Sequence, residues 1–449
     1  MTPTLLITNA RLVNEGQIIE ADLRVRNGRI ERLGPSLDAK PGEPVVDAHG
    51  RYVLPGMIDD QVHFREPGLT HKGNIRTESR AAVAGGVTSF MDMPNTKPPT
   101  IERSELERKY AIAASDSAAN YAFFFGATNH NIDAIRALSS EDACGVKVFM
   151  GASTGNMLVD DEQTLTAIFR DSPLIIATHC ESTPLIEANL AVALDRYGEE
   201  IPVTEHARIR DTEACYRSTD LAVSLAREHD AQLHVLHVSS GRELELFEAG
   251  PVDGKAITAE TCIHFLHFTD ADYATLGNRI KCNPAIKSAE DRDQLLGGLL
   301  SGQLDILATD HAPHTMEEKS DPSYLRAPAG LPLVQDVLLG GLELVHAGHI
   351  ELPLLVAKTA HNPALRFGVR ERGFLREGYW ADLVMVDLEA VTRVTSERVL
   401  SRCGWSPFEG RTFRSRICST WVNGALAFDG ERVVEHTHAR RLQFAATRS

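Results

Sequence analysis

Residues 55–68 read PGMIDDQVHFREPG, a short apolar run that ends in a histidine, an arginine and a carboxylate. The apolar residues of the run are typical of a buried β-strand, and a Pro-Gly pair marks each of its ends. His63 and Arg65 are two residues apart, so both point to the same face of that strand. This pattern indicates either a metal ligand beside an anion-binding group or a core histidine beside a surface ion pair.

Seven more apolar runs follow, separated by stretches with helical periodicity. The eight runs cover residues 57–64, 87–93, 121–128, 145–150, 174–180, 233–238, 257–265 and 304–309, and helix candidates include 101–115, 162–170, 211–229, 289–300 and 333–346. This alternation predicts an α/β fold with a (β/α)8 barrel, and a doubly wound open sheet is the competing topology.

Both ends of the chain have β character instead. Their sequences alternate apolar and polar residues around turn signals such as Asn423-Gly424. We therefore predict three segments: 1–54 as the first part of a small β-sandwich domain, 55–370 as the catalytic (β/α)8 barrel, and 371–449 as the second part of the β-domain.

The composition narrows the class of protein. The chain has 449 residues, and its net charge of −16 argues against a nucleic-acid partner, since phosphate binding requires a basic face. The seven cysteines form no C-x-x-C pair, which is typical of reduced thiols. The sequence shows no signal peptide and no apolar stretch of membrane-spanning length. We therefore expect a cytoplasmic protein with no membrane partner.

Polar residues recur where the predicted strands end, and in a (β/α)8 barrel this is where the chemistry takes place. They are His63, Asn95, Lys147, His179, His237 and Asp310. A single histidine on an apolar strand is usually a core residue, but several at equivalent positions are hard to explain by packing. Neutral imidazole and carboxylate are good zinc ligands, and a catalytic zinc lowers the pKa of a bound water to about 7.

Lys147 is the unusual member of this set, because its ammonium would be buried among apolar neighbours and its pKa should be lowered. A neutral lysine reacts with carbon dioxide to form a carbamate, whose two oxygens could bridge two metal ions. The alternative is a buried salt bridge to Asp92, Glu181 or Asp310.

Six motifs together resemble the cyclic amidohydrolases, and among them most closely the dihydroorotases. These motifs are DDQVHFREPG, MPNT, GVKVFMGAS, THCE, LHVSS and TDHAPHTMEEK followed by APAGLP, and the resemblance covers essentially the whole chain. Dihydroorotases interconvert N-carbamoyl-L-aspartate and (S)-dihydroorotate in de novo pyrimidine biosynthesis. The resemblance implies a hydrolase of cyclic amide C–N bonds that acts on this small-molecule pair.

The resemblance also implies a role for each site residue. The implied metal ligands, for one or two Zn²⁺ per chain, are His63, Lys147 as N6-carboxylysine, His179, His237 and Asp310. Asp310 would also be the general acid/base. Arg65, Asn95 and His314 would hold the substrate carboxylate. Asn283 and the backbone at Ala329 and Gly330 would bind the amide edge of the ring.

One departure leaves alternatives open. Gln61 stands where the family has the first histidine of His-x-His, and glutamine is a poor zinc ligand. The site could hold one metal, hold two with Gln61 as a weak ligand, or be noncatalytic. We favour an active enzyme. The other interpretations are an allantoinase or hydantoinase and a noncatalytic scaffold for a transcarbamoylase.

Two further expectations concern assembly and the loop after Asp310. We expect a homo-oligomer, such as a dimer. The polar segment 315–329 could be a lid over the substrate or an ordinary surface loop.

Overall fold

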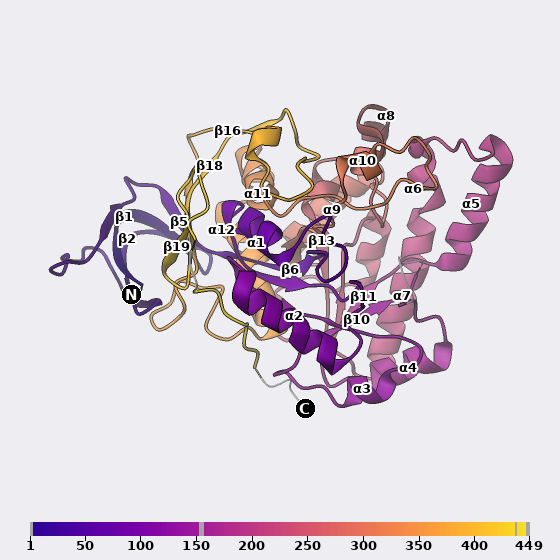
Figure 1. Cartoon of the computed structure of the whole chain (residues 1–449), viewed down its shortest axis with the longest axis horizontal. Helices are drawn as coiled ribbons and strands as arrows, with labels where there is room; N and C mark the ends of the chain where they lie inside the picture. The colour runs from indigo at the N-terminus through magenta and orange to yellow at the C-terminus, as the bar shows by residue number, and fades with distance from the viewer. Residues whose placement is uncertain (1–2, 152–156, 436–437, 446–449) are drawn as a thin grey trace.

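The computed structural model describes residues 3–151, 157–435 and 438–445. Figure 1 shows two parts: a β-domain that contains the N-terminal strands, and a larger barrel surrounded by helices. The last four residues of the predicted C-terminal segment lie outside the described ranges. No helix in the described part of the chain is long and apolar enough to cross a membrane.

The eight predicted runs form the barrel. Its strands are β6 (Met57–Val62), β7 (Val87–Asp92), β8 (Asn120–Phe123) with β9 (Phe125–Gly126), β10 (Val146–Phe149), β11 (Ile176–His179), β12 (Leu233–Val235), β13 (Ile257–Cys262) and β14 (Ile306–Ala308). Neighbouring strands pair in parallel. A bridge between Val62 and His311 joins the last unit to the first, and His63 N–H donates to His311 O at 2.7 Å. The sheet is therefore closed, which excludes the open-sheet alternative.

Helices cover the outside of the barrel. The longer ones are α1 (Ile75–Ala84), α2 (Arg103–Asp116), α4 (Glu162–Asp171), α5 (Thr183–Tyr197), α7 (Thr212–Glu228), α9 (Ala289–Ser301) and α11 (Val337–His346). The shorter ones are α3 (Ile132–Arg136), α6 (His206–Ile209), α8 (Tyr273–Leu276), α10 (Met316–Lys319), α12 (Leu352–Val356) and α13 (Asn362–Phe367). Capping boxes at Asn74 and Ser288 satisfy backbone N–H groups where α1 and α9 begin. The helices that the periodicity predicted are present, with ends shifted by a few residues.

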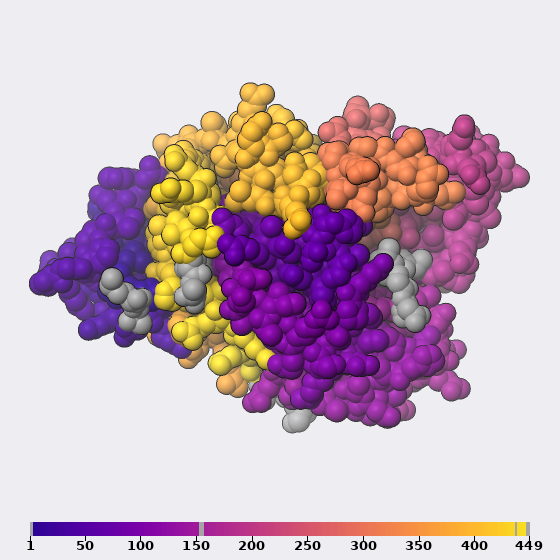
Figure 2. Space-filling view, in the orientation of Figure 1, coloured from indigo at the N-terminus to yellow at the C-terminus, as the bar shows by residue number. Residues whose placement is uncertain are grey.

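Both chain ends contribute strands to one sheet of the small domain. Its strand order is β19-β18-β15-β5-β1-β2-β3, with β4 beside β1. These strands are β1 (Thr4–Asn14), β2 (Gln17–Arg26), β3 (Arg29–Gly34), β4 (Val45–Asp47), β5 (Tyr52–Pro55), β15 (Leu383–Asp387), β18 (Arg416–Val422) and β19 (Ala425–Phe428), and β16 (Thr392–Arg393) pairs with β17 (Thr412–Phe413). In Figure 2 the yellow C-terminal surface lies between the indigo N-terminal strands and the purple first units of the barrel. The fold is thus a (β/α)8 barrel with a small β-sandwich domain, as the sequence predicted.

Candidate active site

A cavity of about 270 Å³ opens where the barrel strands end. The residues that line it include all eleven that the sequence singled out, although these lie in loops and strands far apart in the chain. The lining consists of Gln61, His63, Arg65, Asn95, Lys147, Phe149, His179, Arg210, His237, Asn283, Asp310, Ala312, His314, Pro328, Ala329 and Gly330. The cavity therefore gathers metal-type, cationic and amide side chains in one place.

Two histidines from neighbouring strands face one another in this cavity. Nδ1 of His179, the last residue of β11, lies 2.9 Å from Nε2 of His237. Nε2 of His179 donates to Glu181 Oε2 at 3.0 Å, so Nδ1 carries the lone pair. Burial lowers the pKa of both imidazoles, which keeps them neutral and able to bind a metal ion.

A second pair of polar side chains, His63 and Asp310, lies just after the ends of β6 and β14. Nε2 of His63 lies 3.1 Å from Oδ1 of Asp310, and Nδ1 of His63 lies 2.7 Å from the amide oxygen of Asn95. Because an amide oxygen only accepts, Nδ1 of His63 is the donor in that bond. In the neutral imidazole this leaves the lone pair of Nε2 facing a carboxylate oxygen. A cation between these two acceptors would stabilise the arrangement, so the donor set fits a divalent metal ion.

Lys147 lies inside the barrel on β10 and is 1% exposed. Its Nζ lies 4.7 Å from the ring centroid of Phe149, and burial lowers its pKa to about 8. In the described part of the chain no carboxylate lies within ion-pair distance of Nζ. Asp92 pairs with Lys109, Glu181 pairs with Arg210, and Asp310 lies beside His63. An amine in this setting is partly neutral near neutral pH, which is the form that reacts with carbon dioxide.

The backbone is strained at three of the residues that line the cavity. Arg65, His237 and Asp310 have φ angles of 69°, 42° and 50°, in the left-handed region that favours glycine. Each such residue costs of order 1–3 kcal/mol and persists only where the surrounding structure imposes it. Strained residues of this kind cluster at functional sites, and here all three carry polar side chains into the cavity.

One side of the cavity is cationic. Arg65 is 7% exposed, its Nε donates to Pro313 O at 3.1 Å, and its Nη2 lies 3.1 Å from Nε2 of His314. The ammonium of Lys72 lies 2.9 Å from Nδ1 of His314, and Nε2 of His314 also lies 3.0 Å from Ala329 O. Burial and the nearby Arg65 lower the pKa of His314 to about 3. His314 is therefore a neutral imidazole beside two cations.

Asn283 and Gly330 complete the lining from the opposite loop. The buried Oδ1 of Asn283 has no hydrogen-bond partner among the described residues. Gly330 has φ 141°, and a Cβ there would lie 2.5 Å from Ala312 O, so only glycine fits. Its N–H already donates to Lys281 O at 2.9 Å. The backbone donor that has no acceptor in the described ranges is therefore the N–H of Ala329.

Sequence reasoning missed some residues that contact the site. Arg210 lines the cavity and forms an ion pair with Glu181, which in turn bonds to His179. Glu181 carried a usable signal, because it follows His179 by two residues in THCE. Lys72 and Arg210 carried none, since each resembles an ordinary surface cation in the sequence.

Another group of metal-type side chains lies apart from the cavity lining. Ligand atoms of Asp60, His234 and Glu260 all lie within 4.8 Å of one another, and all three residues are buried. Nε2 of His234 lies 3.2 Å from Asp60 Oδ2 and 3.3 Å from Glu260 Oε2. Glu260 also accepts from the backbone N–H of His237, so this group supports the segment that carries a cavity histidine.

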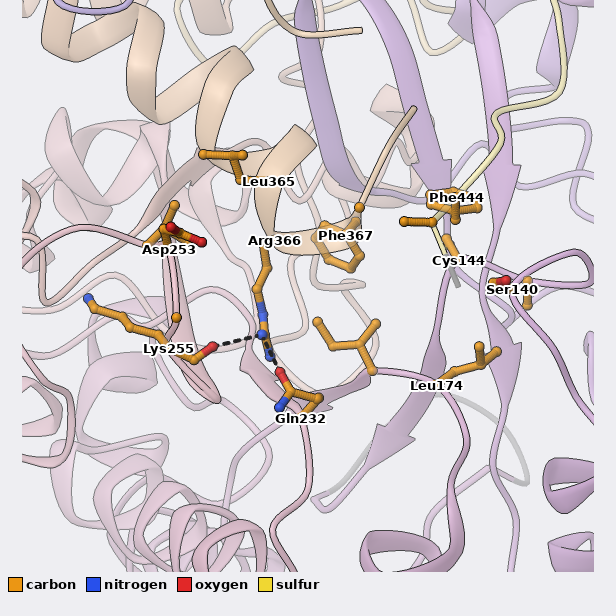
Figure 3. A pocket seen from close by; sticks show the side chains of 16 residues that line it. Ser140, Cys144, Leu174, Gln232, Asp253, Lys255, Leu365, Arg366, Phe367 and Phe444 are labelled. Atoms are coloured by element: carbon orange, nitrogen blue, oxygen red, sulfur yellow. Dashed lines mark hydrogen bonds between the residues drawn. The ribbon is translucent and has the colours of Figure 1, made fainter. Parts of the chain in front are cut away.

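A larger cavity, of about 370 Å³, lies at the opposite end of the barrel, where strands begin. Figure 3 shows Arg366 of α13 pointing to Gln232 and to the backbone of Lys255. Its Nη1 bonds to Gln232 Oε1 at 2.9 Å and to Lys255 O at 3.1 Å, and its Nη2 bonds to Leu233 O at 2.8 Å. None of the described residues that line this cavity is a histidine, and its arginine is occupied with capping strands.

A (β/α)8 barrel with histidines, an aspartate and a buried lysine at its C-terminal strand ends defines a class of metal-dependent hydrolases. This chain belongs to the amidohydrolase family, and the sequence model of that family matches residues 52–427.

Individual relatives carry different names. The chain is 34% identical to an allantoinase of Bacillus velezensis over 441 residues, which cover 96% of each chain. It is also 34% identical to a dihydroorotase of Halobacterium salinarum, over 92% of this chain and 94% of that one. Among solved structures, the L-hydantoinase (dihydropyrimidinase) from Arthrobacter aurescens is 27% identical, with a TM-score of 0.91 over 98% of this chain and 100% of that one. The protein is thus a metal-dependent cyclic amidohydrolase.

Proposed function

We propose that this protein is a dihydroorotase, which interconverts N-carbamoyl-L-aspartate and (S)-dihydroorotate. The observation that carries the proposal is the guanidinium of Arg65. It is buried against the cavity, and no carboxylate of the described residues lies within ion-pair distance of it. A buried unpaired charge is costly, so a substrate that brings its own carboxylate supplies the missing partner. Dihydroorotate carries such a carboxylate, whereas allantoin and hydantoin do not.

The neighbouring groups support the same orientation of substrate. Arg65 offers N–H donors in a fork that matches a carboxylate. The imidazole of His314 flanks this fork, with its Nε2 3.1 Å from Nη2 of Arg65, and we assign it to the same carboxylate. Asn95 keeps its Nδ2 available because its oxygen accepts from His63. Asn283 and the N–H of Ala329 then face the amide edge of the ring.

His63, Lys147 as a carbamate, His179, His237 and Asp310 are the residues we assign to hold Zn²⁺. When bound, the metal supplies Lewis acidity to the amide carbonyl and to the attacking water. Asp310, two residues after β14, accepts a proton from the water and returns it to the departing ring nitrogen. In the reverse direction the same carboxylate takes the proton from the ureido nitrogen as the ring closes.

Allantoinase or hydantoinase activity is the second candidate. It is favoured by the similarity to the Bacillus velezensis allantoinase and to the Arthrobacter aurescens L-hydantoinase. Both reactions open an uncharged cyclic ureide, and for them a buried unpaired arginine has no evident purpose.

The deciding experiment measures dihydroorotate hydrolysis by ultraviolet absorbance on protein of known zinc content, with allantoin and hydantoin assayed in parallel. Turnover of dihydroorotate at least about 100-fold above the other two in kcat/KM supports the proposal. A preference for allantoin or hydantoin would replace it with the second candidate. Absence of both zinc and turnover would favour the noncatalytic scaffold.

A further inference from the structure

The segment 315–330, which follows Asp310, forms one side of the substrate cavity through Pro328, Ala329 and Gly330. It begins with α10, whose N-terminus is closed by a capping box at Thr315. Its sequence is polar, which suits a mobile lid as well as a surface loop. Two buried lysines, Lys319 and Lys281, distinguish between these two possibilities.

Lys319, the last residue of α10, is 2% exposed. Its Nζ donates to three backbone carbonyls, Lys281 O at 2.9 Å, Pro328 O at 3.0 Å and Gly330 O at 3.0 Å. No carboxylate in the described ranges lies within ion-pair distance of it. Three acceptors around one nitrogen match the three N–H donors of an ammonium, and leave none of them unused.

Lys281 makes a similar connection to the same segment. Its Nζ donates to Tyr324 O and Ala327 O, both at 2.6 Å, and lies 4.2 Å from the ring centroid of Tyr324. The hydroxyl of Tyr324 in turn lies 2.8 Å from Nδ1 of His206. The inner side of the segment is therefore bonded at several points along its length.

These bonds join the parts of the chain that form the far side of the cavity. Lys281 O accepts both from Lys319 and from the N–H of Gly330, and Asn283 follows two residues later. Gly330 is packed against Ala312 O and His314, where a Cβ has no room. Three segments therefore meet at the ammonium of Lys319. They are the end of α10, the residues just before Asn283, and Pro328 to Gly330.

We propose that Lys319 is a positioning residue that fixes the Ala329–Gly330 wall of the substrate cavity, so that segment 315–330 is a rigid wall and not a lid. Without the ammonium, three buried carbonyls lose their donor at once, and the wall is free to move away from the cyclic amide. The inference rests on the proposed function only for the identity of the substrate.

Hydrogen–deuterium exchange on the unaltered protein tests rigidity directly. A rigid wall predicts slow exchange of the backbone amides in residues 323–331 without any ligand, and no more than about a twofold change on adding dihydroorotate. Fast exchange that slows on adding dihydroorotate would show a lid and overturn the proposal. Fast exchange without ligand would overturn it even if dihydroorotate does not bind.

A pair of matched variants then tests the role of the ammonium. Lys319→Met keeps the length of the side chain and removes its donors. Lys358→Met is the control, because Lys358 is also buried and donates to a backbone carbonyl, Leu304 O at 2.7 Å, at the far end of the barrel. We expect exchange in 323–331 to accelerate at least about tenfold in Lys319→Met only. Equal exchange in the two variants would overturn the proposal.

Kinetics provide the second readout. In Lys319→Met we expect KM for dihydroorotate to rise about tenfold, kcat to change by less than about threefold, and zinc content to stay unchanged. Lys358→Met should lower Tm without changing KM. If the two variants lose Tm alike and KM is unchanged in both, Lys319 is merely structural. If the unaltered protein does not turn over dihydroorotate, the proposed function fails, while the exchange comparison still decides the role of Lys319.

Discussion

The side-chain amide of Gln61 donates from Nε2 to Oδ1 of Asp310 at 3.2 Å. Its oxygen faces the thiol of Cys262 at 3.9 Å. Gln61 stands where a histidine ligand is expected from the resemblance, yet it directs a donor to the carboxylate. This donor competes with a cation for Oδ1 of Asp310. We therefore expect a metal beside His63 and Asp310 to bind more weakly than one held by Lys147, His179 and His237, and about one metal ion per chain.

Replacing this residue should change metal stoichiometry. In Gln61→His we expect bound zinc to increase from about one to about two ions per chain, because an imidazole lone pair replaces the amide donor. Elemental analysis of purified protein measures this, with Gln61→Asn as the control that keeps the amide. Two zinc ions in the unaltered protein would contradict the expectation.

Removing the arginine should affect charged substrates selectively. In Arg65→Met we expect kcat/KM for dihydroorotate to fall roughly 100-fold, the loss expected for charge-assisted hydrogen bonds worth about 3 kcal/mol. Steady-state kinetics with dihydroorotate check this, and the exposed Arg170→Met is the control. Unchanged dihydroorotate turnover in Arg65→Met would exclude a carboxylate-binding role.

Lys147 should be needed for metal retention. In Lys147→Ala we expect loss of bound zinc and a fall in activity of about 100-fold or more, the scale seen when the surroundings of a metal are disturbed. Acetate or propionate should restore part of both, because a short carboxylate can occupy the place of the carbamate. Zinc content and activity are measured together across a range of acetate concentrations. Full activity without added carboxylate would show that Lys147 has no such role.

Asp336 gives a prediction on stability that is independent of the cavity. It is buried, its Oδ2 accepts from the hydroxyl of Ser406, and burial raises its pKa to about 6. Between pH 4 and pH 6 the folded chain therefore binds more protons at this carboxyl than the unfolded chain does. The contribution of Asp336 to the free energy of unfolding consequently falls as pH rises. The difference corresponds to about 3 kcal/mol.

We expect Asp336→Asn to lack this loss. Its free energy of unfolding, relative to the unaltered protein, should increase by up to about 3 kcal/mol from pH 4 to pH 7. Urea unfolding at several pH values measures the difference. A difference that is constant with pH would show that Asp336 does not titrate in this range.

The barrel was predictable because its strands are buried on both faces, against the helices outside and against one another inside the closed sheet. Each strand is therefore a continuous apolar run in the sequence. Polar residues at the ends of those runs, such as His179 and Asp310, then had to meet at one end of the barrel. Lys72 and Lys319 were not recognisable, because distant segments supply their partners. These are an imidazole and a carboxylate for Lys72, and backbone carbonyls for Lys319. Sequence patterns show a cation but not the acceptors around it.

The sheet of the small domain joins strands that lie on opposite sides of the barrel in the sequence. β5 pairs with β15, so that Pro55 faces Leu383. During synthesis on the ribosome, the edge of β5 that pairs with β15 therefore stays unpaired until the whole barrel and β15 have been synthesised. Open edges of this kind template aggregation. Chains that end before Leu383 should accordingly accumulate as insoluble material, even though they contain every residue that lines the catalytic cavity.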